Sequence, residues 1–331
     1  MRGLRFVGWR LLSMAGTLLA VSVVAFVIIQ LPPGDFADAY VAQKSQAGGA
    51  FSRTDLANLR HSLGLDRPWH EQYLSWMSGI LLRFDFGYSW EWQRPVTELI
   101  ASRMPLTLLL AFSTLLFMYG VALPIGIYSA VRQYSVADYS FSLLGYIGLA
   151  TPNFLLALIL MYFGQQWFGQ SVGGLFLPEY VGQPWSWARF LDLLAHLWVP
   201  VVVLGTAGTA FLVRSMRAVL LDELDKMYVL SAKAGGIAPL RLLIRYPVRL
   251  ALIPIVATLG WRLTYVISGA PIVGVVLGLP DTGPLFLKSL LNQDMQLAGA
   301  LVFIFCALTI IGTFVSDLLL ALLDPRIKLS A

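Results

Sequence analysis

The sequence has few charged residues, a single cysteine and three histidines. Charged residues make up 12 % of the 331 residues, whereas hydrophobic residues make up 58 %. Soluble domains carry about twice that share of charge. So few charges cannot keep so much apolar surface in water, which excludes an ordinary soluble fold and leaves lipid as the solvent. No compact run of Lys and Arg follows a phosphate backbone, so we expect no nucleic-acid partner.

Metal and catalytic motifs are also missing. Cys306 lies alone in an apolar run, and His61, His70 and His196 are too widely spaced to form a ligand pair. The sequence contains neither a G-x-x-x-x-G-K-[ST] phosphate-binding loop nor an H-E-x-x-H zinc motif. We therefore expect no metal site, no cofactor and no ATPase or other catalytic site in this chain.

Long hydrophobic runs are abundant, and a transmembrane helix needs about 20 of these residues. The first run is preceded by arginines, as in a signal peptide, but it exceeds a signal's apolar core and no small-residue cleavage site follows it. We interpret it as a retained span. The sequence predicts an all-α membrane protein with six transmembrane helices over residues 11–31, 104–131, 139–165, 193–213, 250–279 and 296–316.

The distribution of polar residues predicts the organisation around these spans. Residues 1–31 form the N-terminus and first helix, 32–97 a long polar segment, 98–323 a core with five helices, and 324–331 a tail. Within the long segment we expect helices over 55–70 and 72–82. Lys and Arg concentrate in 1–10, 132–138, 214–249 and 317–331, which predicts that both termini and the loop 214–249 are cytoplasmic and the long segment is periplasmic.

The loop 214–249 has the pattern of a helix, a sharp turn and a second helix. Small residues end the first helix, Gly235-Gly236 can adopt left-handed backbone angles, and Pro239 suits the first turn of the next helix. Arg241, Arg245 and Arg249 are spaced to share one helical face. The pattern leaves two interpretations open, a mechanical contact for a partner protein and a solvated loop.

One charge lies well inside a predicted span. Arg262 either lines a water-filled path together with Trp261 and Tyr265, or pairs within the helix bundle, where Asp317 is one available partner. Asn153 follows Pro152 and either lines the same path or caps a kink. These alternatives stay open from the sequence.

Several motifs resemble one family. The order small-Ala-Lys-Ala-x-Gly at 231–236, after Tyr228, resembles the EAA loop of binding-protein-dependent ABC importer permeases. The whole chain resembles the permease family for dipeptides, oligopeptides and nickel. The stretches that carry this resemblance are Leu31-Pro-Pro-Gly-Asp35, Leu63-Gly-Leu-Asp-Arg-Pro68, Gln72-Tyr-Leu-Ser-Trp76, Phe84-Asp-Phe-Gly-Tyr-Ser89, Arg94-Pro-Val96, Ala150-Thr-Pro-Asn-Phe154 and Asp324-Pro-Arg326.

The resemblance implies a type I ABC importer permease fold and a subunit of an ATP-driven importer in the bacterial inner membrane. Its expected partners are a second homologous permease, two ATP-binding subunits, a periplasmic solute-binding protein and the lipid bilayer. The residues implied to couple the chain to the ATPases are Ser231, Ala232, Lys233, Ala234, Gly235, Gly236 and Ile237. The implied solute is a peptide, carried along a path for which Arg262, Tyr265 and Asn153 are candidates.

Two departures from the family pattern affect these expectations. Leu230 stands where the EAA loop has its glutamate, and Leu279-Pro-Asp-Thr-Gly283 replaces the usual aromatic-Pro-Gly-Leu-Gly, with Gly274 at the usual acidic position. The second departure leaves oligosaccharides or glycosides open as solutes. A stand-alone secondary carrier or channel is the alternative from another class, and it would show inverted repeats and intramembrane acidic residues.

Overall fold

The computed structural model describes residues 2–30, 37, 41, 53–89, 91–168 and 173–323. The motifs at 31–35 and 324–326, the tail 324–331 and part of the segment 32–97 lie outside these residues. The chain divides into two compact units. The first unit comprises Met1–Arg10, Leu106–Pro280 and Leu308–Ala331, and the second comprises Leu11–Pro105 and Asp281–Ala307.

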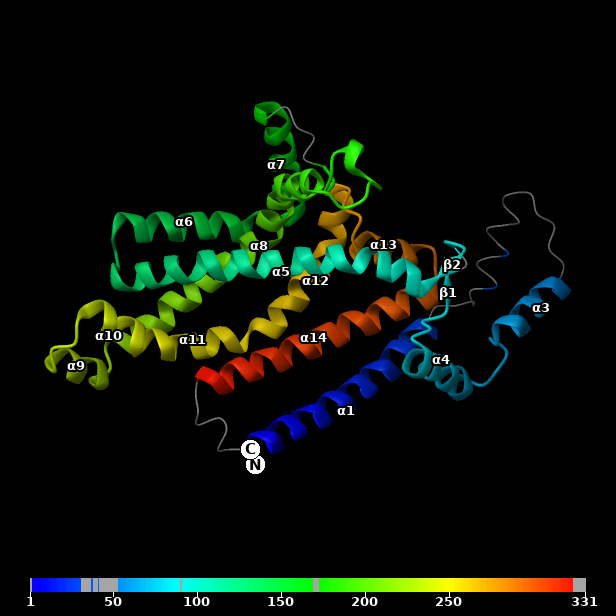
Figure 1. Ribbon diagram of the computed structural model, residues 1–331, viewed down its shortest axis with the longest axis horizontal. Coiled ribbons are helices and arrows are strands. Elements are labelled where there is room, and N and C mark those ends of the chain that lie inside the picture. Colours follow the sequence, from blue (N-terminus) through cyan, green and yellow to red (C-terminus); the bar gives the residue numbers. More distant parts are fainter. Residues whose placement is uncertain are drawn as a thin grey trace. The chain divides into compact units, whose positions relative to one another are not determined.

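The described residues are almost entirely helical (Figure 1). A two-residue antiparallel pair, β1 (Tyr88–Ser89) with β2 (Arg94–Pro95), and a 3₁₀ turn at Pro178–Tyr180 are the other regular elements among them. The helices are α1 (Arg2–Gln30), α3 (Arg53–Leu63), α4 (Trp69–Arg83), α5 (Val96–Val131), α6 (Val136–Ala150), α7 (Asn153–Phe168), α8 (Trp187–Leu224), α9 (Met227–Ala234), α10 (Pro239–Arg245), α11 (Pro247–Ala257), α12 (Leu259–Leu277), α13 (Thr282–Leu291) and α14 (Met295–Leu323).

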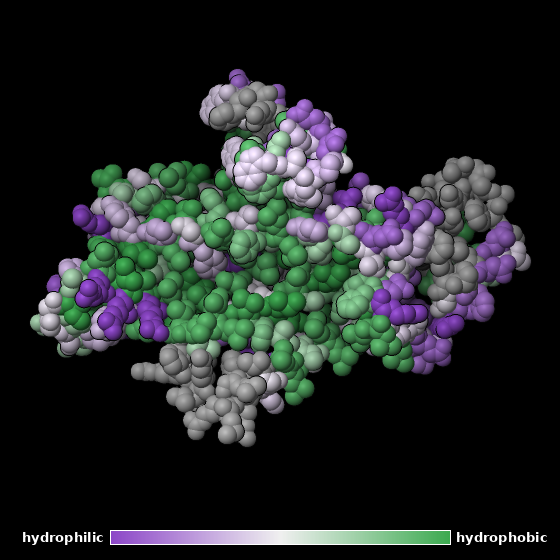
Figure 2. All heavy atoms as spheres, viewed as in Figure 1, coloured by the Kyte–Doolittle hydropathy of each residue, from purple (hydrophilic) through white to green (hydrophobic). Residues whose placement is uncertain are grey.

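Four of these helices, α1, α5, α8 and α14, are individually long and apolar enough to cross a membrane. Two further spans are bent pairs, α6 with α7 and α10–α11 with α12. A third bent pair joins the end of α12 to α13, but α12 already belongs to the fifth span. The described residues thus hold four single-helix candidate spans and three bent pairs, a range of four to seven that includes the six predicted from hydrophobicity. Apolar side chains dominate the surface in Figure 2, as lipid contact requires.

Two predicted spans are not continuous helices, which corrects the expectation from hydrophobicity. The span predicted over 139–165 bends by 106° between Ala150 and Asn153. Pro152 causes this break, because proline disfavours helical angles in the residue before it and has no N–H to donate. The span predicted over 250–279 bends by 44° between α11 and α12, one turn after Pro254. A run of apolar residues carries no signal for such bends.

The polar segment before α5 also differs in detail from the prediction. The helix expected over 55–70 is wrong, because α3 ends at Leu63 and α4 begins at Trp69. Gly64 adopts a φ of +67°, which ends α3, and Pro68 stands directly before α4. Left-handed glycine and proline are the usual signals for a helix end and a helix start.

In the second unit, α4 packs against α1 through aromatic side chains. Tyr73 places its hydroxyl 2.8 Å from the Ser22 hydroxyl, and its ring lies 5.5 Å from the ring of Phe26. Trp76 lies 6.1 Å from Phe26 and 6.0 Å from Phe303 of α14. Tyr73 and Trp76 are the aromatic residues of the Gln72–Trp76 motif, so that motif serves to dock α4 onto the spans.

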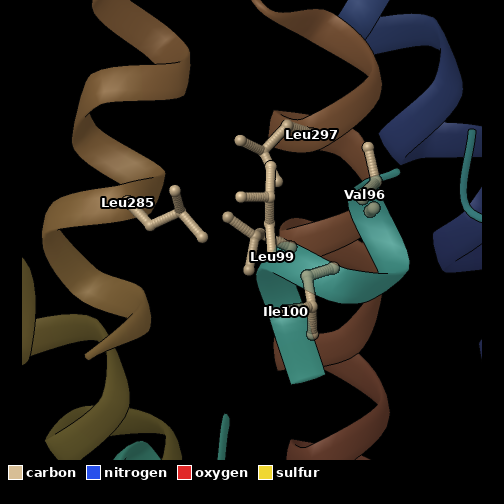
Figure 3. Close-up of a cluster of buried hydrophobic side chains, with 7 residues drawn as sticks. Val96, Leu99, Ile100, Leu285 and Leu297 are labelled. Carbon is tan, nitrogen blue, oxygen red and sulfur yellow. The ribbon is translucent and has the colours of Figure 1, made fainter. Parts of the chain in front are cut away.

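The second unit also contains a buried aliphatic cluster formed by the start of α5, α13 and the start of α14. Figure 3 shows these side chains pointing toward one another from the helices. The β1–β2 pair is fastened to the same helices, since Gln296 accepts a hydrogen bond from the Tyr88 N–H at 2.8 Å and Asp294 accepts one from Ser89. The cluster consists of Val96, Leu99, Ile100, Leu285, Leu297, Ala300 and Leu301.

In the first unit, α8 is the central helix and packs against α6, α7, α11 and α12. It begins at a Ser186 cap, whose hydroxyl accepts a hydrogen bond from the Arg189 N–H, and continues to Leu224. The predicted span over 193–213 therefore covers only its middle. The last turns of α8 extend into the loop predicted over 214–249 and carry the segment described next.

Candidate functional site

The corner between α8 and α9 is fixed by Glu223. This carboxylate accepts a hydrogen bond from the Tyr228 hydroxyl at 2.6 Å and pairs with Lys226. Burial raises the pKa of Glu223, but the hydrogen bonds from Lys226 and Tyr228 outweigh it and the net pKa is lowered. Burial and the Glu223 carboxylate raise the pKa of Tyr228. The corner therefore stays closed by a charged group at neutral pH.

A Schellman turn ends α9. The Gly236 N–H donates to the Lys233 carbonyl at 3.0 Å, and the Ile237 N–H donates to the Ala232 carbonyl at 3.4 Å. Gly236 has a φ of +77°, whereas Gly235 has an ordinary φ of −73°. The predicted helix, sharp turn and helix are thus confirmed, and of the two glycines only Gly236 needs left-handed angles.

The segment 227–245 presents large apolar side chains at its surface, and Figure 2 shows hydrophilic side chains beside them. Val229 is buried and anchors α9. Most of the predicted site residues here are exposed, and Ala232 and Ile237 are half-buried. The large exposed apolar side chains are Met227, Leu230, Leu240 and Ile244. Exposed apolar groups rimmed by polar ones are typical of a contact with another protein.

The three arginines expected on one helical face do not share one, which corrects that expectation. α10 ends at Arg245, and Tyr246, with φ −114° and ψ −80°, separates it from α11. Arg249 lies in α11 and donates from Nε and Nη2 to the Leu323 carbonyl at 3.3 and 3.1 Å. Arg249 therefore satisfies a carbonyl at the end of α14, as a basic residue near a helix C-terminus does.

An ion pair with a buried carboxylate joins the start of α6 to α8. Arg217 donates from Nε and Nη2 to the two carboxylate oxygens of Asp138, both at 2.9 Å. The Tyr134 N–H donates to the same carboxylate at 3.0 Å. Arg217 lowers the pKa of Asp138, and Asp138 raises the pKa of Arg217. Sequence reasoning missed this pair, because its members are 79 positions apart and no local pattern links them.

Arg262 lies inside the first unit and is 3 % exposed. Its guanidinium carbon is 4.3 Å from the ring centre of Phe211 and 4.9 Å from that of Trp261. Its Nε and Nη2 have no hydrogen-bond acceptor among the described residues. Asp317, one expected partner, instead pairs with Arg10 at 3.1 Å, so that alternative is wrong.

The other two path candidates lie on α12 and on α7, two helices that pack against each other. Tyr265 is half-buried on α12, and its ring stacks 6.3 Å from that of Trp261. Asn153 is half-buried at the first position of α7, directly after the Pro152 break, and α7 packs against α12. Within the described part of the chain no hydrogen bond joins Asn153 to Arg262. Nor do three His, Cys, Asp or Glu side chains gather there at metal-binding geometry.

Comparison with known families confirms the resemblance seen in the motifs. Residues 122–329 match the family described as "Binding-protein-dependent transport system inner membrane component". Residues 3–111 match the N-terminal component of the same transport systems. Together the two matches cover the region from the first helix to the last residues.

Individual relatives align over nearly the whole chain. A candidate peptide permease of Brucella ovis is 34 % identical over 99 % of this chain and 100 % of its own length. The oligopeptide transport system permease protein AppB of Bacillus subtilis is 33 % identical over 94 % of this chain and 95 % of its own. The glutathione transport system permease protein GsiC of Salmonella typhimurium is 30 % identical over 98 % of this chain and 99 % of its own.

A solved structure shares the fold. A chain of the MetNI methionine ABC transporter, in an inward-facing conformation, superposes with a TM-score of 0.53 at 16 % identity. The superposition covers 68 % of this chain and 96 % of that one. At this identity the likeness concerns the arrangement of helices alone.

Proposed function

Because the chain belongs to the family of binding-protein-dependent transport system inner membrane components, we propose that it forms, with a second homologous permease, the peptide path of an ATP-driven importer. It is a multi-pass inner membrane protein and the membrane component of its system, so ATP is hydrolysed by separate subunits and solute is delivered by a binding protein. The full-length match to peptide, oligopeptide and glutathione permeases is the observation that carries the choice of peptides.

The segment around Ser231–Ile237 is the lever in this proposal. α9 is a short helix held at a fixed angle by Glu223 on one side and by the Gly236 turn on the other. Leu230 stands at the glutamate position of the EAA loop and is exposed, so an apolar contact replaces a salt bridge to the ATPase. The excess of Lys and Arg in the short loops supports a cytoplasmic position for this segment and for both termini.

The path runs along α12 and α7 in this proposal. Arg262 and Tyr265 lie on α12, and Asn153 lies at the break that starts α7. Polar groups inside spans face a partner or water, because lipid offers neither hydrogen bonds nor charge. Breaks within spans also concentrate where a protein lines a cavity, since the freed backbone groups must be satisfied there.

Oligosaccharides or glycosides remain the second candidate solutes, favoured by the altered outer segment Leu279–Gly283. A stand-alone carrier or channel receives no support, because the chain aligns end to end with components of binding-protein-dependent systems.

The test is reconstitution. The tagged chain is purified in mild detergent from its native membrane with whatever subunits accompany it, and is placed in liposomes with the binding protein from its own locus. We expect an ATP-binding pair and a second permease to co-purify, and peptide uptake to require ATP. Solute flux by this chain alone without ATP would overturn the proposal. ATP-dependent uptake of sugars without peptides would overturn the choice of solute.

A further inference from the structure

Arg262 has two hydrogen-bond donors on one edge of its guanidinium group that find no acceptor among the described residues of the first unit. Its Nε and Nη2 lack acceptors, although the residue is only 3 % exposed. Burying an unpaired cation among membrane spans is unfavourable, because lipid offers it neither counter-charge nor hydrogen bonds. Stacking on Phe211 and Trp261 offsets only part of that cost, because a cation–π contact is weaker than a charged hydrogen bond.

The unused edge has the geometry that binds carboxylates elsewhere in this chain. Arg217 uses the same two atoms, Nε and Nη2, to hold both oxygens of Asp138 at 2.9 Å. Two parallel N–H groups on one side of a guanidinium match the spacing of carboxylate oxygens. In Arg262 this edge is complete and has no acceptor within the described residues.

The aromatic cover over Arg262 is itself at the surface of the chain. Phe211 is 41 % exposed and Trp261 is 58 % exposed. Arg262 therefore lies beneath two aromatic side chains that are themselves exposed on α8 and α12. The bend between α11 and α12 lies just before Arg262, with Thr258 between the two helices.

We infer that Arg262 is a receptor for a carboxylate of the transported solute, which takes the Nε–Nη2 edge when Phe211 and Trp261 move aside. This inference rests on the proposed function and adds a chemical requirement to it. The solute carries at least one carboxylate, as a peptide does at its C-terminus and a neutral oligosaccharide does not. We choose the solute as the occupant because the two rings that stack on the guanidinium are exposed; a side chain of the second permease is the other occupant, and the experiment separates the two.

The experiment measures uptake by the assembled importer in liposomes, with the loaded binding protein at saturation. The solutes are a tripeptide with a free C-terminal carboxylate and the same tripeptide as its carboxamide. We expect the ratio of acid to amide uptake to fall about tenfold in Arg262→Gln, since a charged two-pronged hydrogen bond is lost. Arg262→Lys keeps the charge without the planar edge and should give an intermediate ratio.

Arg214→Gln is the matched control, because Arg214 also stacks on an aromatic ring, that of Tyr146 at 5.7 Å, but is exposed. It should leave the ratio unchanged. If the wild type carries no amide at all, the readout is the acid alone. Arg262→Gln should then lower kcat without changing KM for the loaded binding protein, and Arg262→Lys should recover part of the loss.

Three results would overturn the inference. An equal loss for acid and amide, with a lower thermal midpoint of the assembled complex, would assign the carboxylate to the second permease. Unchanged uptake of both in Arg262→Gln would show that no carboxylate binds there. A wild type without ATP-dependent peptide uptake would instead reject the proposed function, and the inference with it.

Discussion

Arg217 of α8 holds Asp138 of α6 with two parallel hydrogen bonds of 2.9 Å. This contact ties the start of α6 to the last turns of α8, which lead into α9. The carboxylate is buried, and Arg217 is about one quarter exposed, at 26 %. In the proposed function α9 moves together with the end of α8, and a rigid link between α8 and α6 would carry that movement to a second span.

Replacing Asp138 by Asn should weaken the first unit. The substitution leaves Arg217 without its counter-charge and removes one of two charged hydrogen bonds, each worth about 2 kcal/mol. We expect a lower midpoint for thermal aggregation in detergent and weaker stimulation of ATP hydrolysis by the loaded binding protein. Asp222→Asn is the control, because Asp222 is exposed and makes no ion pair within the described residues. Equal effects of the two substitutions would contradict the role given to the pair.

The same pair predicts a pH dependence. Arg217 lowers the pKa of Asp138 in the folded protein, whereas the pKa of an aspartate in the unfolded chain is about 3.9. The stabilisation is therefore fully present above about pH 4 and is lost as the pH falls through the lowered folded-state value. The difference in thermal midpoint between wild type and Asp138→Asn should stay constant from about pH 8 to 5 and shrink only below about pH 4. A difference that vanishes already near neutrality would assign the effect to another group.

The effect of a substitution at position 236 should depend on whether the new residue can adopt left-handed backbone angles. A Cβ at Gly236 meets nothing within 4 Å, so space is open, but its φ of +77° strains most residues and β-branched ones above all. We expect Gly236→Val to uncouple ATP hydrolysis from uptake while the chain still inserts. Gly236→Asn should retain most coupling, since Asn adopts left-handed angles readily.

The neighbouring glycine provides the control for this prediction. Gly235 has an ordinary φ, and a Cβ there makes only ordinary contacts at 3.5 Å. Gly235→Ala should couple normally in the reconstituted importer. Normal coupling in Gly236→Val, measured as peptide molecules carried per ATP hydrolysed, would remove Ser231–Ile237 from the role of lever.

Gly260 is required for the contact between α12 and α14 in the first unit. A Cβ at Gly260 would lie 2.5 Å from the backbone nitrogen of Thr313 and 2.6 Å from its Cα, so one helix must shift. We expect Gly260→Ala to destabilise the protein by about 1–3 kcal/mol, as overpacking does. The readout is the thermal midpoint in detergent. Gly120→Ala on α5 meets nothing within 4 Å and should leave the midpoint unchanged. Similar midpoints for both variants would show that α12 and α14 can separate freely.

Hydrophobic runs and glycine–proline signals predicted most of the architecture. The six predicted apolar segments fall on the four long helices and on two of the bent helix pairs, and Gly235-Gly236 with Pro239 located the end of α9 and the start of α10. These features are local, since a span depends on the composition of about 20 residues and a helix end depends on one or two. The angles at Pro152 and Thr258 were not predictable, because a proline marks a possible break and neighbouring helices decide the bend.

Side-chain partners were predicted less well than elements. Arg262 was identified as exceptional by its charge, but the stacking on Phe211 depends on how α8 and α12 pack. Asp317 was one available partner for it and instead binds Arg10, which comes from the other end of the chain. Contacts of this kind are set by tertiary packing between helices far apart in sequence, so a single sequence gives the candidates and leaves their partners open.

The predicted orientation can be tested with the chain's own cysteine content. Cys306 is the single cysteine, so Cys306→Ser provides a background without thiols. Into it one cysteine is placed at Ser75, exposed on α4, or at Ser231, exposed on α9. A membrane-impermeant maleimide should label Ser75→Cys on intact spheroplasts and label Ser231→Cys only after the membrane is opened, because the basic loops favour a cytoplasmic α9. The background variant controls for nonspecific labelling. Labelling of Ser231→Cys on intact spheroplasts would reverse the orientation, place α9 outside and leave the ATP-binding subunits without access to it.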